Sequence, residues 1–299
     1  MLLSLSLCIH FVNFCLFLEL YFLYILVSII RGWLMDEEYR VFDIGQIVNI
    51  PGTLPIGLVV FFKSEALLKV GVLKESLGIV SSLGFPILYF ILSQPKPSAP
   101  ISGFLVVDAV NRADKIPELV EKLRRQADIM KVEVVKPLFD NILINTYYST
   151  LSVAGERSVI FRKALYRALI KTVREFFGTG GGALLYHIGT VIGSQAFKDH
   201  KRIAGDDLGK LVKISEALFK ALGFGEVRIL EVNTKNQKAR VRIMNNFECE
   251  LFKQARQPSS HFVRGLWSGW FQALFGREVR NLEVKCIAKG DSYCEFEIY

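Results

Sequence analysis

The order of apolar segments between residues 54 and 139 constrains the fold of this chain more than any other feature of its sequence. β-Branched runs bounded by glycine or proline are typical of strands, and apolar residues three or four positions apart are typical of helices. The two patterns follow one another as 54–62 (strand), 65–83 (helix), 86–93 (strand), 103–110 (strand), about 114–128 (helix) and 131–139 (strand). The order βαββαβ predicts an α+β, ferredoxin-like domain, in which a four-stranded antiparallel sheet carries two helices on one face.

Part of this region, GVLKESLGIVSSLGFPI (71–87), resembles the ACT domain, a small regulatory module of amino-acid metabolism. The resemblance rests on Gly71, Val72, Leu73, Gly84 and Ile87. It covers roughly residues 54–138, and it implies an ACT-like fold with an amino acid as ligand. Lys69 and Val70 stand where the family often has an aspartate and a proline. Amino-acid binding and a sheet used only for dimerisation therefore both stay open.

Residues 1–30 carry one formal charge, Glu19, and the run is long enough to span a bilayer. One interpretation is a membrane anchor with a cytoplasmic body. The other is that residues 1–34 are not made and translation starts at Met35, which the polar sequence DEEYR follows. The run is a poor signal peptide, because it lacks a basic start and a small-residue cleavage site. We therefore divide the chain into an apolar leader (1–34), a linker (35–53), an ACT-like domain (54–140) and a second domain (141–299).

The charge balance of the 299-residue chain favours acidic partners, because its formal net charge is +8. The predicted helix 157–177 carries a basic stripe of Lys163, Arg167, Lys171 and Arg174. No helix-turn-helix pattern accompanies this stripe, so we interpret it as a solvated face and expect no nucleic-acid partner. The five cysteines form no dense framework, which favours a reducing compartment. We expect a cytoplasmic protein, or a membrane-anchored one if residues 1–30 are real.

The segment GTGGGALLYHIGTVIGSQAF (178–197) places a glycine-rich loop before a predicted helix. Such loops can bind phosphate through their backbone N–H groups. No Walker lysine follows, and the spacing does not match the dinucleotide pattern, so we predict no nucleotide cofactor. Gly189 and Gly193 share one helical face, which permits close packing of another backbone or of a ligand.

The C-terminal segment 258–299, taken with YHIGTVIG (186–193) and NNFECELF (245–252), resembles the vinyl-4-reductase domain. The matching residues are Gly265, Gly269, Glu283, Cys286, Lys289, Gly290, Asp291, Cys294 and Phe296. The resemblance covers roughly residues 150–299. It implies an α/β domain with a buried apolar pocket for a small molecule. The family includes chlorophyll-pathway proteins, bacterial aromatic-sensing activators and many archaeal proteins.

The resemblance also implies a metal site, because the aromatic-sensing members hold zinc with three cysteines and a glutamate. Three of these ligands match Glu283, Cys286 and Cys294, whereas the fourth corresponds to Ser260, and serine is a poor zinc ligand. His261 and Cys249 are the substitutes nearest in sequence. We predict a structural zinc site of Cys249, Glu283, Cys286 and Cys294. The alternative is a set of buried cysteines without metal.

Aromatic residues crowd the segment 262–275, and Tyr186 and His187 lie on the glycine-paired helix. Pockets for apolar ligands are lined in this way, with a few polar groups that orient the ligand. We predict Tyr186, His187, Trp267 and Trp270 as ligand-binding residues. The alternative is that these side chains belong to the protein core.

Together these features favour a non-enzymatic regulatory sensor that binds an apolar or aromatic small molecule in its C-terminal domain. We expect a homodimer, because ACT-like sheets commonly pair and the resemblance of the C-terminal domain implies pairing there too. The alternative is a 4-vinyl reductase-type enzyme or accessory factor of tetrapyrrole metabolism. We favour the sensor, because the sequence shows no dinucleotide fingerprint, no flavin signature and no acid–base constellation.

Overall fold

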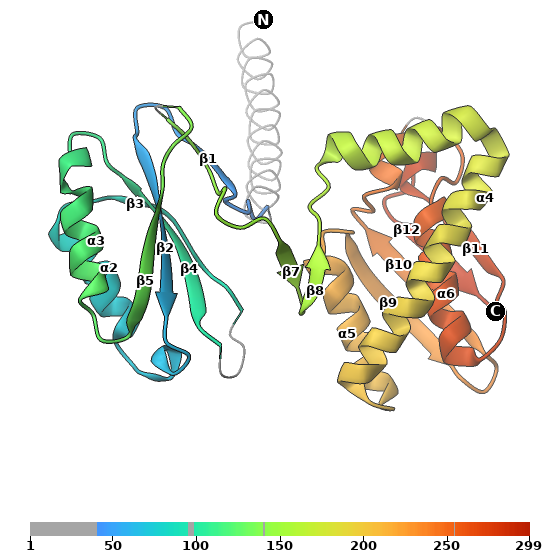
Figure 1. Cartoon of the computed structure of the whole chain (residues 1–299). Helices are drawn as coiled ribbons and strands as arrows, with labels where there is room; N and C mark the ends of the chain where they lie inside the picture. The colour runs from blue at the N-terminus through green and yellow to red at the C-terminus, as the bar shows by residue number, and fades with distance from the viewer. Residues whose placement is uncertain (1–40, 95–98, 140, 254) are drawn as a thin grey trace, which may run out of the picture. The chain divides into compact units, whose positions relative to one another are not determined.

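The computed structural model describes residues 41–94, 99–139, 141–253 and 255–299. Packing divides the chain into two compact units, with the division between Ser158 and Val159 (Figure 1). The apolar leader and Met35 lie outside the described residues. Within the described ranges, no helix is both long and apolar enough to cross a bilayer. The sequence boundary between residues 140 and 141 stays a prediction.

The first unit contains the expected succession of strands and helices. Its elements are β2 (Pro55–Phe62), α2 (Val72–Ser82), β3 (Ile87–Leu92), β4 (Ile101–Asp108), α3 (Ile116–Arg124) and β5 (Ile129–Val135). The strands form an antiparallel sheet in the order β3-β4-β2-β5. Figure 1 shows α2 and α3 on the same face of this sheet, where both share one apolar core with it. The predicted mixture of helices with an antiparallel sheet is confirmed.

A short second layer covers the other face of this sheet. β1 (Ile47–Asn49) pairs antiparallel with β6 (Ile142–Ile144), and Val48 and Leu143 are buried against Phe104 of β4. The strand β2 is therefore buried on both faces, which explains its unbroken apolar sequence PIGLVVFF. The segment predicted as a linker thus contributes a strand to the first unit.

Two expectations at the borders of elements differ from the structure. The helix predicted over 65–83 begins only at Val72, after the short 3-10 turn η1 (Ala66–Leu68), because Gly71 has a φ of +104°. A residue in this left-handed region interrupts an α-helix, and glycine adopts it without strain. The strand predicted over 142–151 is divided between β6 and β7 (Leu151–Val153), which forms a hairpin with β8 (Glu156–Ser158).

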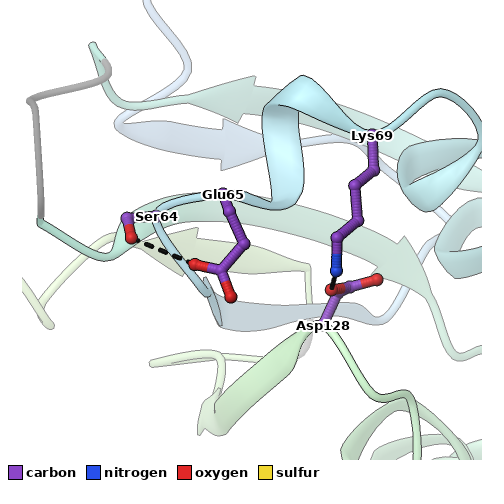
Figure 2. A network of polar contacts seen from close by, with 4 residues as sticks. All are labelled: Ser64, Glu65, Lys69 and Asp128. Carbon is purple, nitrogen blue, oxygen red and sulfur yellow. Dashed lines mark hydrogen bonds and ion pairs between the residues drawn. The ribbon is translucent and has the colours of Figure 1, made fainter.

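A polar network closes the loop that precedes α2 (Figure 2). Lys69 Nζ lies 2.5 Å from Asp128 Oδ1, and Ser64 Oγ donates to the Glu65 carboxylate at 3.1 Å. The Lys69 ion pair connects this loop to the residue before β5, although an exposed pair of this kind contributes little stability. Val70, next to it, is fully exposed. The two positions where this chain departs from the ACT pattern are therefore an ion-paired lysine and a solvent-facing valine.

The second unit packs three helices with an antiparallel sheet of order β11-β12-β10-β9. Its elements are α4 (Lys163–Ala204), α5 (Leu208–Ala221), β9 (Glu226–Asn233), β10 (Lys238–Met244), η3 (Cys249–Phe252), α6 (His261–Phe275), β11 (Asn281–Lys285), η4 (Ile287–Lys289) and β12 (Cys294–Ile298). One apolar core joins the three helices to the sheet. Figure 1 shows α4 running along α6 after a sharp bend.

The bend in α4 lies in the glycine-rich segment that we expected to be a loop. Gly178 alone leaves the helical conformation, with φ 52° and ψ −126°, and the following glycines are helical. A Cβ on Gly181 would collide with the backbone of Val173, so this glycine permits the two arms of the helix to meet at the bend. The glycine-rich segment therefore turns the chain and is not a phosphate-binding loop before a helix.

Four glycines bring α4 and α6 into backbone contact. A Cβ on Gly189 or Gly193 would lie under 3.0 Å from main-chain atoms of α6. A Cβ on Gly265 or Gly269 would approach main-chain atoms of α4 equally closely. Gly189 and Gly193 thus pack against another backbone. This is one of the two alternatives that the sequence left open, the other being a ligand. We call this contact the glycine crossing.

Candidate functional site

Three thiols and one carboxylate come together where η3, β11, η4 and β12 meet. Cys249 begins η3, Glu283 lies on β11, Cys286 follows β11, and Cys294 begins β12. Their candidate ligand atoms all lie within 4.8 Å of one another, and all four residues are buried. The structure therefore brings together the four residues predicted as metal ligands. We call them the cysteine–glutamate cluster.

The chemistry and spacing of this cluster fit a metal ion. Ligand atoms on a tetrahedral zinc ion are roughly 3.5–3.8 Å apart, given Zn–S and Zn–O distances of about 2.3 and 2.0 Å. Cys249 Sγ and Cys286 Sγ are 3.4 Å apart, so small shifts would produce that geometry. Three sulfur ligands and a carboxylate complete a four-coordinate set. Of the two substitutes nearest in sequence to Ser260, Cys249 joins the cluster, whereas His261 lines the cavity described below.

Ser260 occupies the interior of the same cluster. Its Oγ donates to Glu283 Oε1 at 2.7 Å and lies 2.8 Å from Cys249 Sγ. Its backbone N–H donates to Glu283 Oε2 at 3.2 Å. Ser260 therefore holds the carboxylate in place while Cys249 supplies the sulfur next to it.

The titration of the cluster follows from its burial and its shared hydrogen bonds. Burial, together with the hydrogen bond to Cys286, raises the pKa of Glu283 to about 8. Hydrogen bonds from Cys249 and Cys286 lower the pKa of Cys294 to about 4, whereas hydrogen bonds to Cys286 and Cys294 raise the pKa of Cys249. Of these two thiols, Cys294 therefore ionises the more readily. Cation binding would displace protons from the other groups, which makes it pH-dependent.

A second feature of this unit is a cavity of about 590 Å³ beside the glycine crossing. α4 contributes Gly182, Ala183 and Tyr186 to its wall, and α6 contributes His261 and Arg264. The His261 ring packs on Gly182, where a Cβ would lie 3.0 Å from the ring. Two sides of the cavity therefore belong to helices that contact one another along their backbones, and Val279, Arg280 and Asn281 complete its lining.

Asn281, at the start of β11, fixes the polar part of the cavity wall. Its Nδ2 donates to Arg264 O at 2.9 Å and to Ser268 Oγ at 3.1 Å, and Tyr186 Oη donates to the same Ser268 Oγ at 2.9 Å. Asn281 Oδ1 is buried and has no hydrogen-bond partner among the residues that the structure describes. The buried Arg264 Nε is likewise unpartnered within the described ranges. Among the described residues, one hydrogen-bond donor and one hydrogen-bond acceptor are thus left without partners in residues that line the same cavity.

The four residues predicted to contact a ligand lie in three different environments. Tyr186 lines the cavity, and His187 is exposed on α4. Trp267 and Trp270 are each 1% exposed in the core of the second unit. Trp270 Nε1 donates to His200 Nδ1 at 3.2 Å. The structure therefore places one of the four beside this cavity, and ligand contact by any of them stays a prediction.

Sequence reasoning missed Arg264 and Asn281 as residues of a candidate ligand site. Arg264 had a usable signal, because it is the one Lys, Arg, Asp or Glu residue in the apolar helix HFVRGLWSGWFQALF. Asn281 had none, because its importance depends on Arg264 and Ser268, which lie far from it in the sequence.

Comparison with known protein families identifies residues 239–299 as a vinyl-4-reductase domain. The predicted domain of this type is thereby confirmed for these residues. Residues of this chain are 32% identical over 120 positions to the uncharacterized protein MJ0150 of Methanocaldococcus jannaschii. That match covers 40% of this chain and 65%, less than two thirds, of the relative's length.

Solved structures also match part of this chain. The phenol-responsive sensory domain of the transcription activator PoxR, solved with phenol, has a TM-score of 0.46 at 18% identity, covering 51% of this chain and 81% of that chain. A vinyl-4-reductase family protein from Methanocaldococcus jannaschii has a TM-score of 0.29 at 19% identity, covering 48% of this chain and 98% of that chain.

Proposed function

We propose that this chain, which carries a vinyl-4-reductase domain at residues 239–299, is a non-enzymatic regulatory protein that binds a small molecule in its second unit. The observation that carries the proposal is the cavity of about 590 Å³ beside the glycine crossing. This volume is in the range of small-molecule sites, and the backbone contact between α4 and α6 makes the walls rigid. Tyr186 and Val279 offer apolar surface for an aromatic or aliphatic ligand body.

The cysteine–glutamate cluster supports a structural role for zinc in this function. A zinc ion there would connect η3, β11, η4 and β12, and the four protein ligands would leave no coordination position open for a substrate. Ser260, the residue before α6, contacts the cluster, and His261, the first residue of α6, lines the cavity. The ion would thereby fix the start of one cavity wall.

The first unit completes the proposal as a ferredoxin-like, ACT-like regulatory module. The strand order β3-β4-β2-β5, with α2 and α3 on one face, supports this assignment. An amino acid in this module remains part of the proposal, although Lys69 is already paired with Asp128. We place the protein in the cytoplasm as a homodimer. Ligand binding would change the balance of two states that differ in affinity for the ligand.

Native mass spectrometry of the purified full chain tests the proposed function. We expect an organic adduct in the native mass that disappears on denaturation. The variant Ala183→Trp places a large ring in the cavity from an exposed helical position and should lose the adduct. The matched control Leu184→Trp lies one position away, outside the wall, and should keep it. Turnover of a vinyl tetrapyrrole with a reduced nicotinamide or flavin would instead support the enzyme alternative.

A further inference from the structure

The cavity of the second unit has a positively charged wall. Arg264 and Arg280 both line it, and none of its nine described lining residues is acidic. Burial and the nearby guanidinium groups of Arg174 and Arg264 lower the pKa of His261 to about 4, so its ring is neutral at pH 7. Arg264 and Arg280 therefore give the cavity wall a net positive charge. A concave surface of one sign attracts ligands of the other sign.

Arg264 is held in place while part of its guanidinium group stays unsatisfied. Its Cζ lies 5.3 Å from the centroid of the Tyr186 ring, which positions the group by a cation–π contact. Its Nε is buried without a partner in the described part of the chain. A buried charged donor without an acceptor is unfavourable, and an anion beside the guanidinium group would offset part of that cost through its charge.

Asn281 adds a second requirement for the ligand, because the side-chain amide of Asn281 can have only one orientation. Ser268 Oγ uses its hydrogen to donate to Arg264 O, so it accepts from Asn281 Nδ2. Arg264 O is a carbonyl acceptor and also needs the Nδ2 donor. The oxygen Oδ1 must therefore be the buried atom left without a partner, and a hydrogen-bond donor of the ligand can satisfy it once the side chains that cover it shift toward the cavity.

We propose that the cavity binds a small organic anion, whose carboxylate or phosphate oxygens lie between Arg264 and Arg280 and whose hydroxyl or N–H group donates to Asn281 Oδ1. This inference rests on the proposed function and specifies the class of ligand. The volume of about 590 Å³ leaves room for an aromatic or short aliphatic body beside Tyr186.

Isothermal titration calorimetry on the full chain tests this inference with matched probes. The probes are 4-hydroxybenzoate, its neutral analogue 4-hydroxybenzamide, and phenyl phosphate, so that the carboxylate and the phosphate are separated. We expect one of the anions to bind at least about tenfold more tightly than the amide, the size of one charge-assisted hydrogen bond. Arg264→Gln and Arg280→Gln should each weaken that binding about tenfold or more. Arg240→Gln, an exposed arginine on β10 away from the cavity wall, should not.

Arg280 is exposed, so its variant should fold even if Arg264→Gln destabilises the protein. Equal affinity for 4-hydroxybenzoate and 4-hydroxybenzamide, unchanged in both variants, would overturn the anion assignment and leave the small-molecule site standing. If no probe binds at millimolar concentration, mass spectrometry of the molecule extracted from the protein separates the two claims. A neutral extracted molecule overturns this inference alone, and the absence of any molecule overturns the proposed function as well.

Discussion

Ser260 Oγ lies 2.8 Å from Cys249 Sγ, so a serine lies directly beside the sulfur that would complete a four-ligand metal site. The two residues come from different elements, the turn η3 and the residue before α6. Ser260 Oγ contacts Glu283, and Cys249 Sγ contacts both Ser260 Oγ and Cys286 Sγ, so a thiol can enter the cluster from either position.

This relationship predicts that the position of the third sulfur can be exchanged. Cys249→Ser should lower zinc affinity by at least about tenfold, because it leaves three strong ligands. The double variant Cys249→Ser/Ser260→Cys should regain most of that affinity, since the new sulfur lies next to Glu283. Metal content by inductively coupled plasma mass spectrometry after dialysis against a zinc buffer measures both. Full zinc loading of Cys249→Ser, or no metal in the unaltered protein, would contradict the four-ligand site.

The glycine crossing predicts a large effect of a single methyl group. Gly193→Ala should lower the free energy of unfolding by on the order of 2–3 kcal/mol, because its Cβ would overlap the backbone of α6 at Leu266. Gly180→Ala, in the same helix with open space around it, should be neutral or slightly stabilising. Urea unfolding of the two variants provides the comparison. Equal stability of both would show that α4 and α6 do not touch along their backbones.

The low pKa of His261 predicts a pH-dependent loss of stability. The folded protein protonates His261 only near pH 4, whereas the unfolded chain does so near its ordinary value of 6.5. Its contribution to the free energy of unfolding is therefore fully present above pH 6.5 and declines as the pH falls from 6.5 to about 4. Burial and the guanidinium groups of Arg174 and Arg264 cause the shift, and Cys286 opposes it.

Urea unfolding between about pH 7.5 and about pH 4.5 tests whether this contribution to stability falls with the pH, because the range spans most of the His261 titration. The His261→Gln variant should lose less stability than the unaltered protein over that range. The comparison cancels the opposite effect of Glu248 and Glu283, whose pKa values burial raises to about 7 and about 8. Parallel pH profiles for the two proteins would show that His261 titrates as a solvent-exposed group.

An apolar stripe on α4 predicts where a homodimer would form. Leu184, Ile188 and Val191 recur three or four residues apart and are 46%, 41% and 60% exposed. Val191→Glu should convert the expected dimer to a monomer in light scattering coupled to gel filtration. Lys213→Glu, an exposed charge reversal on α5, should leave the mass unchanged. A dimer that persists in Val191→Glu would place the interface elsewhere.

The periodic parts of the fold could be predicted from sequence, whereas the positions that depend on backbone geometry could not. Strands such as β2 and β4 were predictable because both are continuous apolar runs bounded by turn residues. The start of α2 was misplaced, because apolar spacing does not reveal the positive φ of Gly71. The glycine-rich segment was expected to be a loop, but tight packing keeps it helical after Gly178.

The two parts of the candidate site also differ in how far the sequence could predict them. The cysteine–glutamate cluster could be proposed because Glu283, Cys286 and Cys294 match the zinc ligands that the family resemblance implies, and Cys249 lies near in sequence to the missing fourth ligand. A pocket was expected, with Tyr186 among its residues, but Arg264 and Asn281 were not, because their place in its wall depends on contacts across long sequence separations. Trp267 and Trp270 attracted attention as large aromatics, yet side chains of this size also fill cores.

A crystal structure of the full chain, purified without added ligand, would test the central claim of small-molecule binding most directly. We predict electron density for one organic molecule between α4 and α6, in contact with Arg264 and within hydrogen-bond distance of Asn281 Oδ1. Ordered water alone in this cavity, with an organic molecule bound elsewhere in the second unit, would contradict the assignment of the site. A protein that carries no organic molecule and takes up none of the three calorimetric probes would contradict the function itself.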